Sequence, residues 1–402
     1  MNALATAVDA VVQAQVGRTF PACSVCVAHG GRVVLEKAWG WLDPETRLLP
    51  AQANTLFDFA SLTKLVTTTA LLALLGKHGL GVDTPLVEIV PEFGAVNPRG
   101  IDGGQDPHSK DHLPTPAAME GQQVDVGSVT LRHLLTHTSG LPPWRDVYKA
   151  AGPAPAPPGQ PDPLPHPARW ANALAALVQY PFVAPPDGVV RYSDIGLLLL
   201  GEAVARLHAS GDLEAAIRRQ VIDSLPPGEL GFNPVGSGMK AREQTAPTED
   251  DPTWRKRRVW GEVHDENACG VGGVAGHAGL FGTARALAAF GLRWQKEREP
   301  FGVPAAVRDA AISEQATTGG VRRGLGFALK AAEDSMAGDR LSMASFGHSG
   351  FTGTTLWIDP EAELVIAVLT NSVYYGRHSE AYARTHTFRR ALHDAIAEAC
   401  EG

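Results

Sequence analysis

The chain has 402 residues, of which 44% are apolar and 19% are charged, so it can bury a sizeable core as one large or two interleaved domains. Its formal net charge of −8 argues against nucleic-acid binding, because phosphate backbones attract basic surfaces. The apolar runs at 65–75 and 195–200 are too short to cross a bilayer. We therefore expect a globular protein without a membrane span.

The first segment, residues 2–16, predicts an amphipathic helix with Leu4, Val8 and Val12 on one face. Because the first 17 residues contain no lysine or arginine, no secretory signal is visible. The expected location is therefore cytoplasmic, unless a leader has been removed from the chain.

A β-hairpin is predicted near each end of the chain. "SVCVAHGGRVVLEKAWGW" turns at Gly30 and Gly31, and "TTLWIDPEAELVIAVLTN" turns near Asp359 and Pro360. A helical pattern follows at about 380–399. Because an isolated hairpin is marginal in water, we expect the two ends to meet in one antiparallel sheet covered by helices.

The middle of the chain differs from its ends. Helical patterns alternate there with long loops rich in proline and glycine, and the helices are expected at 65–76, 129–136, 195–207 and 283–293. The predicted fold is mixed α/β (α+β), with an α/β sandwich domain from residues 1–60 plus 320–402. A mainly helical domain at 61–319 would be inserted into it, with the active site at the interface.

One predicted helix start carries two unusual polar residues. In "FDFASLTKLVTTTALLALLG", Ser61 and Lys64 are three residues apart, so on a helix they share one face and can form a hydrogen bond. A serine near a helix N-terminus also lies in the positive end of the helix dipole, which favours a developing oxyanion. We interpret Asp58 as the N-cap residue.

Two further stretches could complete a serine-based site. "GVVRYSDIGLLLLGE" places Tyr192, Ser193 and Asp194 directly before an apolar helix, where short polar side chains can point into a cleft. "FGHSGFTGTTLWIDP" places His348 at the start of a strand, with glycines that permit close backbone approach to a ligand.

These three stretches, in this order along the chain, resemble the three motifs of the penicillin-recognising serine hydrolases. The motifs are S-x-x-K, then Y-x-N or S-x-N, then K-T-G. The class C β-lactamase-like branch is the more specific likeness, which "VTLRHLLTHTSGLP" and "GEVHDENACGVGGVAGHAGLFGTARALAAF" also support. The family fold is an α/β sandwich with an antiparallel sheet plus a helical domain. It agrees with the arrangement inferred above from the sequence patterns.

The resemblance implies an acyl-enzyme route that needs no cofactor and no metal. Ser61 would attack an ester or amide carbonyl while Lys64 and Tyr192 handle its proton. The backbone N–H groups of Ser61 and Phe351 would form the oxyanion hole. Water activated by Tyr192 would release the acyl group.

The expected substrate-binding residues are Asp194, His348, Ser349 and Gly350, and two of them depart from the family pattern. Asp194 replaces an asparagine and, if ionised, would raise the pKa of Lys64, which would then act as a cation that holds Tyr192 as phenolate. His348 replaces a lysine and is a weaker anchor for a substrate carboxylate. Both variants occur among esterases and peptidases of the family, so the resemblance supports the fold more strongly than it supports β-lactam hydrolysis.

Three functions stay open at this point. The first is a serine hydrolase acting on carboxylic esters, with weak β-lactam turnover. The second is a DD-carboxypeptidase or D-aminopeptidase acting on cell-wall peptides. The third is a catalytically silent binding protein of the same fold. The expected partner is a small molecule, with no nucleic acid, and the sequence leaves the oligomeric state open.

Other polar clusters carry weaker signals. His133 and His137 lie four residues apart but lack a third metal ligand, and the glycine-rich run from Gly270 follows no strand pattern that would indicate a nucleotide site. His264 begins a dense polar cluster, His264-Asp265-Glu266, which we expect near the active site in a supporting position.

Overall fold

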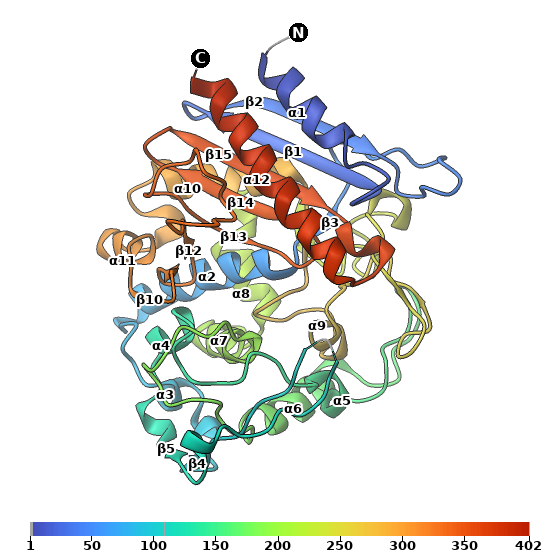
Figure 1. Cartoon of the computed structure of the whole chain (residues 1–402). Helices are drawn as coiled ribbons and strands as arrows, with labels where there is room; N and C mark the ends of the chain where they lie inside the picture. Colours follow the sequence, from blue (N-terminus) through green and yellow to red (C-terminus); the bar gives the residue numbers. More distant parts are fainter. Residues whose placement is uncertain (1–2, 108, 402) are drawn as a thin grey trace.

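The computed structural model describes residues 3–107 and 109–401, and its largest sheet, which is antiparallel and eight-stranded, lies in the upper half of Figure 1. The strand order is β10-β11-β12-β13-β14-β15-β1-β2. Its strands are β1 (Ala22–His29), β2 (Arg32–Gly40), β10 (Ala316–Thr318), β11 (Val321–Arg323), β12 (Ala328–Leu329), β13 (Phe346–Ser349), β14 (Thr355–Asp359) and β15 (Leu364–Thr370).

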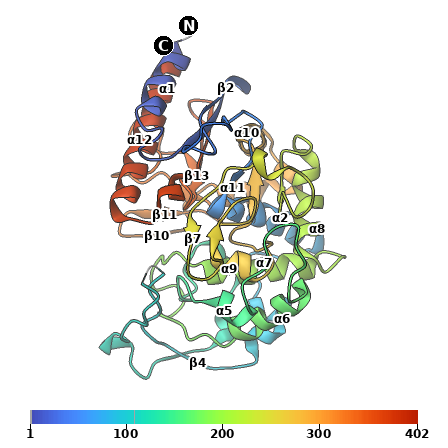
Figure 2. The same cartoon turned by 90° about the vertical axis from the view of Figure 1, so that its right-hand side faces the viewer.

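The two predicted hairpins meet in this sheet. β1 pairs with β15, so that Val25 lies opposite Val368, and the termini of the described chain lie side by side in both views (Figures 1 and 2). Gly30 and Gly31 have φ of 57° and 78°, the left-handed values that a two-residue hairpin turn needs. The prediction that both ends build one antiparallel sheet is confirmed.

Helices cover both faces of the sheet. α1 (Ala3–Gln13) and α12 (Ser379–Glu401) pack on one face, where Val8 and Leu392 are fully buried. α10 (Ala284–Lys296) packs on the other face against β1, β14 and β15. Figure 2 shows α1 and α12 beyond the sheet, on the side away from the remaining helices. The predicted fold class, an antiparallel sheet flanked by helices, is confirmed.

Strand alternation separates the two cysteines of the C-x-x-C sequence. Cys23 packs in the core between the sheet and α1 and α12, whereas Cys26 packs in the larger core on the opposite face. Both are free thiols.

The remaining helices and short strands lie largely on the α10 side of the sheet (Figure 2). The helices are α2 (Thr63–His78), α3 (Leu86–Ile89), α4 (Leu131–Leu135), α5 (Val147–Ala151), α6 (His166–Leu177), α7 (Asp194–Leu207), α8 (Leu213–Gln220), α9 (Glu266–Gly270) and α11 (Ala305–Ala311). β3 (Phe57–Asp58), β9 (Leu280–Gly282) and β6 (Leu230–Phe232) form a three-stranded sheet. There are also two two-stranded sheets. One pairs β4 (Arg99–Gly100) with β5 (Gln123–Val124), and the other pairs β7 (Asp250–Asp251) with β8 (Arg257–Arg258).

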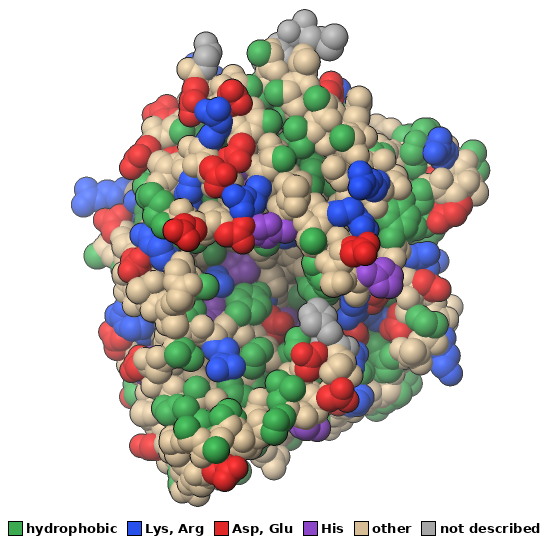
Figure 3. Space-filling model, in the orientation of Figure 1, with side chains coloured by type: hydrophobic (Ala, Val, Ile, Leu, Met, Phe, Trp, Pro, Cys, Tyr) green, Lys and Arg blue, Asp and Glu red, His purple; other side chains and the backbone are tan. Residues whose placement is uncertain are grey.

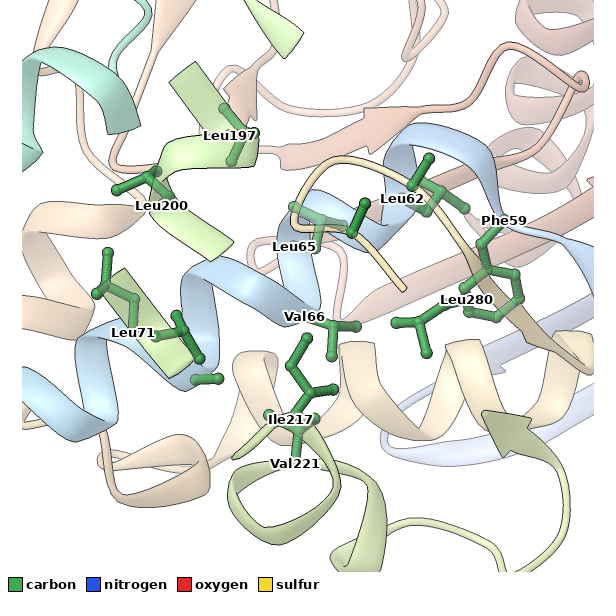
Figure 4. Close-up of a cluster of buried hydrophobic side chains, with 14 of the residues drawn as sticks. Phe59, Leu62, Leu65, Val66, Leu71, Leu197, Leu200, Ile217, Val221 and Leu280 are labelled. Atoms are coloured by element: carbon green, nitrogen blue, oxygen red, sulfur yellow. The ribbon is translucent and has the colours of Figure 1, made fainter. Parts of the chain in front are cut away.

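α2 is the central buried helix. Every residue from Thr63 to Leu75 is buried, and Leu65, Val66 and Leu71 pack among side chains of α7 and α8 (Figure 4). A helix that is apolar all round belongs in a core. Any charged residue on α2 therefore needs a partner, which makes Lys64 the residue to explain.

The proposed division into two domains stays a prediction. α10 comes from the range assigned to the helical domain, yet it packs on the main sheet. The boundary at residue 320 falls in the turn between β10 and β11, both of which belong to that sheet. Among the described residues, no helix is long and apolar enough to cross a membrane.

Candidate active site

Ser61 lies in a single 3-10 turn, Ala60–Leu62, between β3 and α2. Ala60 has a φ of 48°, which is a strained value for a residue with a side chain. Asp58 does not cap the helix as predicted, because it belongs to β3 and α2 begins only at Thr63. Its carboxylate instead accepts hydrogen bonds from the backbone N–H of Ala60 (2.8 Å) and of His264 (2.6 Å). Asp58 thus ties the turn that carries Ser61 to a distant loop.

The predicted catalytic residues come together. Lys64 Nζ lies 2.8 Å from Ser61 Oγ, and the Tyr192 hydroxyl donates to the same oxygen at 2.7 Å. Lys64 is 1% exposed and also donates to the His277 carbonyl at 3.0 Å. Its charge is balanced by Asp194 Oδ1, 2.8 Å away. The buried lysine therefore has a full set of partners.

The pKa shifts define the resting charges. Burial is the largest single influence on Lys64 and works to lower its pKa, but Asp194 and Tyr192 together outweigh it and raise that pKa above its usual 10.5. Burial raises the pKa of Tyr192 above its usual 10.0, although the Lys64 ammonium opposes the shift. These directions make Lys64 a cation and Tyr192 a phenol at rest, and the prediction that Lys64 holds Tyr192 as a phenolate during the reaction stays a prediction.

Tyr192 and Asp194 are positioned by the start of α7. Ser193 is the N-cap, and its hydroxyl accepts a hydrogen bond from the Gly196 N–H at 3.0 Å. The Ser193 N–H donates to His137 Nδ1 at 3.1 Å, and His137 stacks near Tyr192 with ring centres 4.7 Å apart. The tyrosine and the aspartate flank this cap and both reach Lys64.

His348 and Ser349 end strand β13, whereas the sequence analysis placed them at the start of a strand. The chain turns after them because Gly350 passes against the Ser61 turn, where an added Cβ would lie 2.5 Å from the Phe59 carbonyl oxygen. The His348 Nδ1–H donates to the Ser349 carbonyl at 2.7 Å. Burial lowers the pKa of His348 well below 6.5, so it is neutral and cannot be a charged anchor.

A buried arginine supports the loop that carries Phe351. The Arg389 guanidinium, from α12, donates to the backbone carbonyls of Gly350, Gly353 and Thr354. The N–H of Phe351, the second predicted oxyanion donor, belongs to this loop. Arg389 therefore positions one side of the predicted oxyanion hole.

We expect Arg389→Met to lower the free energy of unfolding by about 3 kcal/mol, because it leaves several buried carbonyls without a donor. Urea unfolding measures the change. Arg390→Met is the matched control: it removes a partly exposed arginine that pairs with the exposed Asp334 and Asp339, and it should cost less than about 1 kcal/mol. Equal losses in the two variants would contradict the assigned role of Arg389.

Two cavities meet at Ser61. The larger, of about 1030 Å³, extends from Ser61 past His348, Ser349 and Gly350 towards α12. The smaller, of about 230 Å³, includes Asp194 and His264. Ser61, Tyr192 and Phe351 line both cavities. Figure 3 shows this face hollowed near its middle, with histidine side chains inside the hollow. A substrate bound across Ser61 would place one part in each cavity.

Arg323 is a residue of this site that the sequence analysis missed. It lines the larger cavity, and its guanidinium carbon lies 5.6 Å from the ring centre of Tyr192. Among the described residues no acidic side chain pairs with it, and its Nε is buried without a hydrogen-bond partner. Its neighbour Arg322 pairs with Glu314 instead. Both arginines line the larger cavity, and the sequence did not indicate which of them would lack an acidic partner.

The remaining histidine clusters have structural partners. His133 pairs with Asp187 at 2.9 Å and His277 with Asp265 at 2.8 Å. Within the described part of the chain, no group of three histidine, cysteine or acidic side chains could hold a metal ion. His264 lies in the wall of the smaller cavity, which Ser61 also lines, and its supporting role stays a prediction.

Comparison with known proteins places this geometry in a family. Residues 8–387 match the family described as Beta-lactamase. A Salmonella agona (strain SL483) protein, named provisionally as a D-alanyl-D-alanine carboxypeptidase, is 26% identical over 386 residues, covering 90% of this chain and 81% of its own.

Solved structures show the same fold. EstCE1, described as a hydrolase with promiscuous acyltransferase activity, aligns with a TM-score of 0.67 at 20% identity over 98% of each chain. A penicillin-binding protein homologue from Caulobacter crescentus aligns with a TM-score of 0.64 at 18% identity, again over 98% of each chain. With the family match spanning nearly the whole chain, this protein belongs to the β-lactamase family and is a serine hydrolase.

Proposed function

We propose that the protein hydrolyses carboxylic esters through an acyl-enzyme on Ser61. The observation that carries the proposal is the position of Ser61 Oγ, within 2.8 Å of both Lys64 Nζ and the Tyr192 hydroxyl, where two cavities meet. A serine hydroxyl needs a neighbouring group that accepts its proton before it becomes an effective nucleophile.

The reactive form of the site is the Lys64–Tyr192 pair with one proton fewer than at rest. Ser61 Oγ bonds to the ester carbonyl carbon while its proton passes to the Tyr192 oxygen. The N–H groups of Ser61 and Phe351 bind the oxyanion. The bond to the alcohol then breaks, and the alcohol oxygen receives the proton. Water then attacks the acyl carbonyl in the same way, its proton passing to the Tyr192 oxygen. The bond to Ser61 Oγ breaks, Ser61 regains a proton, and the acid is released.

Asp194 and His348 have separate roles in this proposal. Asp194 keeps Lys64 charged, so that the ammonium stabilises negative charge on Tyr192 and on Ser61 during attack. His348 offers a neutral ring next to the alcohol or acyl group in the larger cavity. A neutral ring suits an uncharged ester group better than it suits the carboxylate of a β-lactam.

The test is turnover of p-nitrophenyl butyrate by the purified protein, with and without benzylpenicillin. We expect hydrolysis, slowed by penicillin, and a mass increase of one penicillin on the peptide that contains Ser61. No turnover, together with no adduct on that peptide, would contradict the proposal. An adduct without any turnover would favour the silent binding protein.

The pKa shifts predict an alkaline rate profile. The pKa values of both Lys64 and Tyr192 lie above their usual values, so at neutral pH the reactive form, with one proton fewer, is scarce. It becomes about tenfold more abundant with each unit rise in pH until the pH reaches those pKa values. We expect kcat/KM for p-nitrophenyl butyrate, corrected for spontaneous hydrolysis, to rise about tenfold per unit from pH 6 to 9. A plateau beginning near pH 7 would show that the base has a much lower pKa.

A second candidate is a DD-carboxypeptidase, which one observation favours. Arg323 is a cation in the larger cavity without an acidic partner among the described residues, so it could bind the terminal carboxylate of a peptide. The Salmonella agona relative carries the same activity in its provisional name. Release of D-alanine from diacetyl-L-lysyl-D-alanyl-D-alanine, lost in Arg323→Gln, would establish this activity beside or in place of ester hydrolysis.

A further inference from the structure

His264 is a buried histidine whose ring has no hydrogen bond. It is 3% exposed, and among the described residues neither ring nitrogen has a partner. The Glu249 Oε1 atom, 4.0 Å from Nε2, is too distant for a hydrogen bond. Most buried polar side chains in proteins are paired, so a ring left in this state next to the predicted nucleophile needs a reason.

Backbone hydrogen bonds and ring stacking nevertheless hold the His264 ring in place. The His264 N–H donates to Asp58 Oδ2 at 2.6 Å, and its carbonyl accepts from Arg255 at 2.7 Å. The ring stacks on Phe351, with centres 5.6 Å apart and planes 23° apart. Backbone bonds and stacking therefore orient the imidazole without using either nitrogen, and the residue forms part of the lining of the smaller cavity.

The acidic groups around this ring already have side-chain partners. Asp194 pairs with Lys64, and Asp265 pairs with His277. Glu266 pairs with Lys110 at 3.2 Å and with Arg377 at 3.1 Å. The cavity therefore offers no unpaired charge among these residues to a substrate.

The His264 ring itself is neutral. Burial, and then the nearby cations Arg377 and Arg255, lower its pKa well below 6.5. A neutral imidazole has one N–H donor and one acceptor nitrogen. The group that satisfies it best is uncharged and can both donate and accept.

We propose that His264 determines substrate specificity by binding a hydroxyl or amide group on the part of the substrate that fills the smaller cavity. This inference rests on the proposed ester hydrolysis at Ser61. The cavity of about 230 Å³ limits that part to a short chain. A plain alkyl chain leaves the imidazole unsatisfied, so the hydroxylated analogue should react about tenfold faster or more.

The test compares matched esters with the wild-type protein. One pair is p-nitrophenyl 3-hydroxybutyrate and p-nitrophenyl butyrate, with the hydroxyl on the acyl side. The other is 3-hydroxybutyl acetate and butyl acetate, with the hydroxyl on the alcohol side. We expect a preference of about tenfold or more in kcat/KM for the hydroxylated ester in one of the two pairs. No preference in either pair overturns the inference.

His264→Phe keeps an aromatic ring for stacking but removes both nitrogens, so it should lose the preference. The matched control is Trp144→Phe, which reduces another wall of the same cavity and should keep it. A preference that persists in His264→Phe overturns the inference. If this variant does not fold, the comparison of the matched esters with the wild-type protein decides the inference. Ester turnover that survives Ser61→Ala would instead refute the proposed function, which separates the two failures.

Discussion

Replacing Ser61 with alanine is expected to lower kcat for p-nitrophenyl butyrate by about 10⁴-fold or more, the loss seen when a serine hydrolase loses its nucleophile. The reason is geometric, because Ser61 Oγ is the atom on which both Lys64 and Tyr192 converge. The measurement is steady-state turnover at pH 8, with the spontaneous rate subtracted.

The same variant separates catalysis from folding. Ser61 is only partly buried, so its loss should change the free energy of unfolding by less than about 1 kcal/mol. Ser61→Ala should also form no penicillin adduct on the peptide containing residue 61. A variant that is folded and still turns over the ester at more than about one tenth of the wild-type rate would exclude Ser61 as the nucleophile.

Replacing Lys64 with methionine is expected to lower kcat by about 10³-fold or more, since Ser61 and Tyr192 lose the cation that stabilises negative charge on them. Methionine fills a similar volume in the buried helix, so packing changes little. The alkaline rise of kcat/KM should persist and extend to higher pH, because Tyr192 still has to lose its proton and no longer has the cation that lowers its pKa.

Lys64→Met should also destabilise the fold, because it leaves the partly buried Asp194 without its partner. The double variant Lys64→Met/Asp194→Asn removes that unpaired charge and should recover most of the lost stability, measured by urea unfolding. It should not recover kcat. Recovery of both would mean that Lys64 acts only through stability and has no part in the chemistry.

Local patterns were sufficient to predict the elements that carry the site. The hairpins at both ends and the helices around residues 65–76 and 195–207 follow from alternation, helical spacing and turn residues. The resemblance of the S-x-x-K and R-Y-S-D stretches to a known family placed Ser61, Lys64 and Tyr192 in one candidate site. Residues three apart at a helix start are neighbours in almost any fold, so Ser61 and Lys64 could be paired before the structure was known.

Local patterns failed where the backbone changes direction. Asp58 looked like a helix cap, but it lies in a two-residue strand whose pairing with β9 depends on residues more than 200 positions away. His348 was placed at the start of a strand, whereas close packing against the Ser61 turn ends the strand at Ser349. In both cases a long-range contact outweighed the local preference.

The sequence by itself determined the type of elements, the antiparallel sheet joining the two ends, and the residue types that a serine hydrolase needs. Only the tertiary structure decided which charges are paired. Arg322 and Arg323 are neighbours in the chain and both line the larger cavity, yet Arg322 pairs with Glu314 whereas Arg323 has no acidic partner among the described residues. Likewise, the state of Tyr192 and the unpaired ring of His264 depend on burial and on charges from distant segments. Burial and long-range electrostatics arise only when the chain is folded, so no short stretch of sequence carries them.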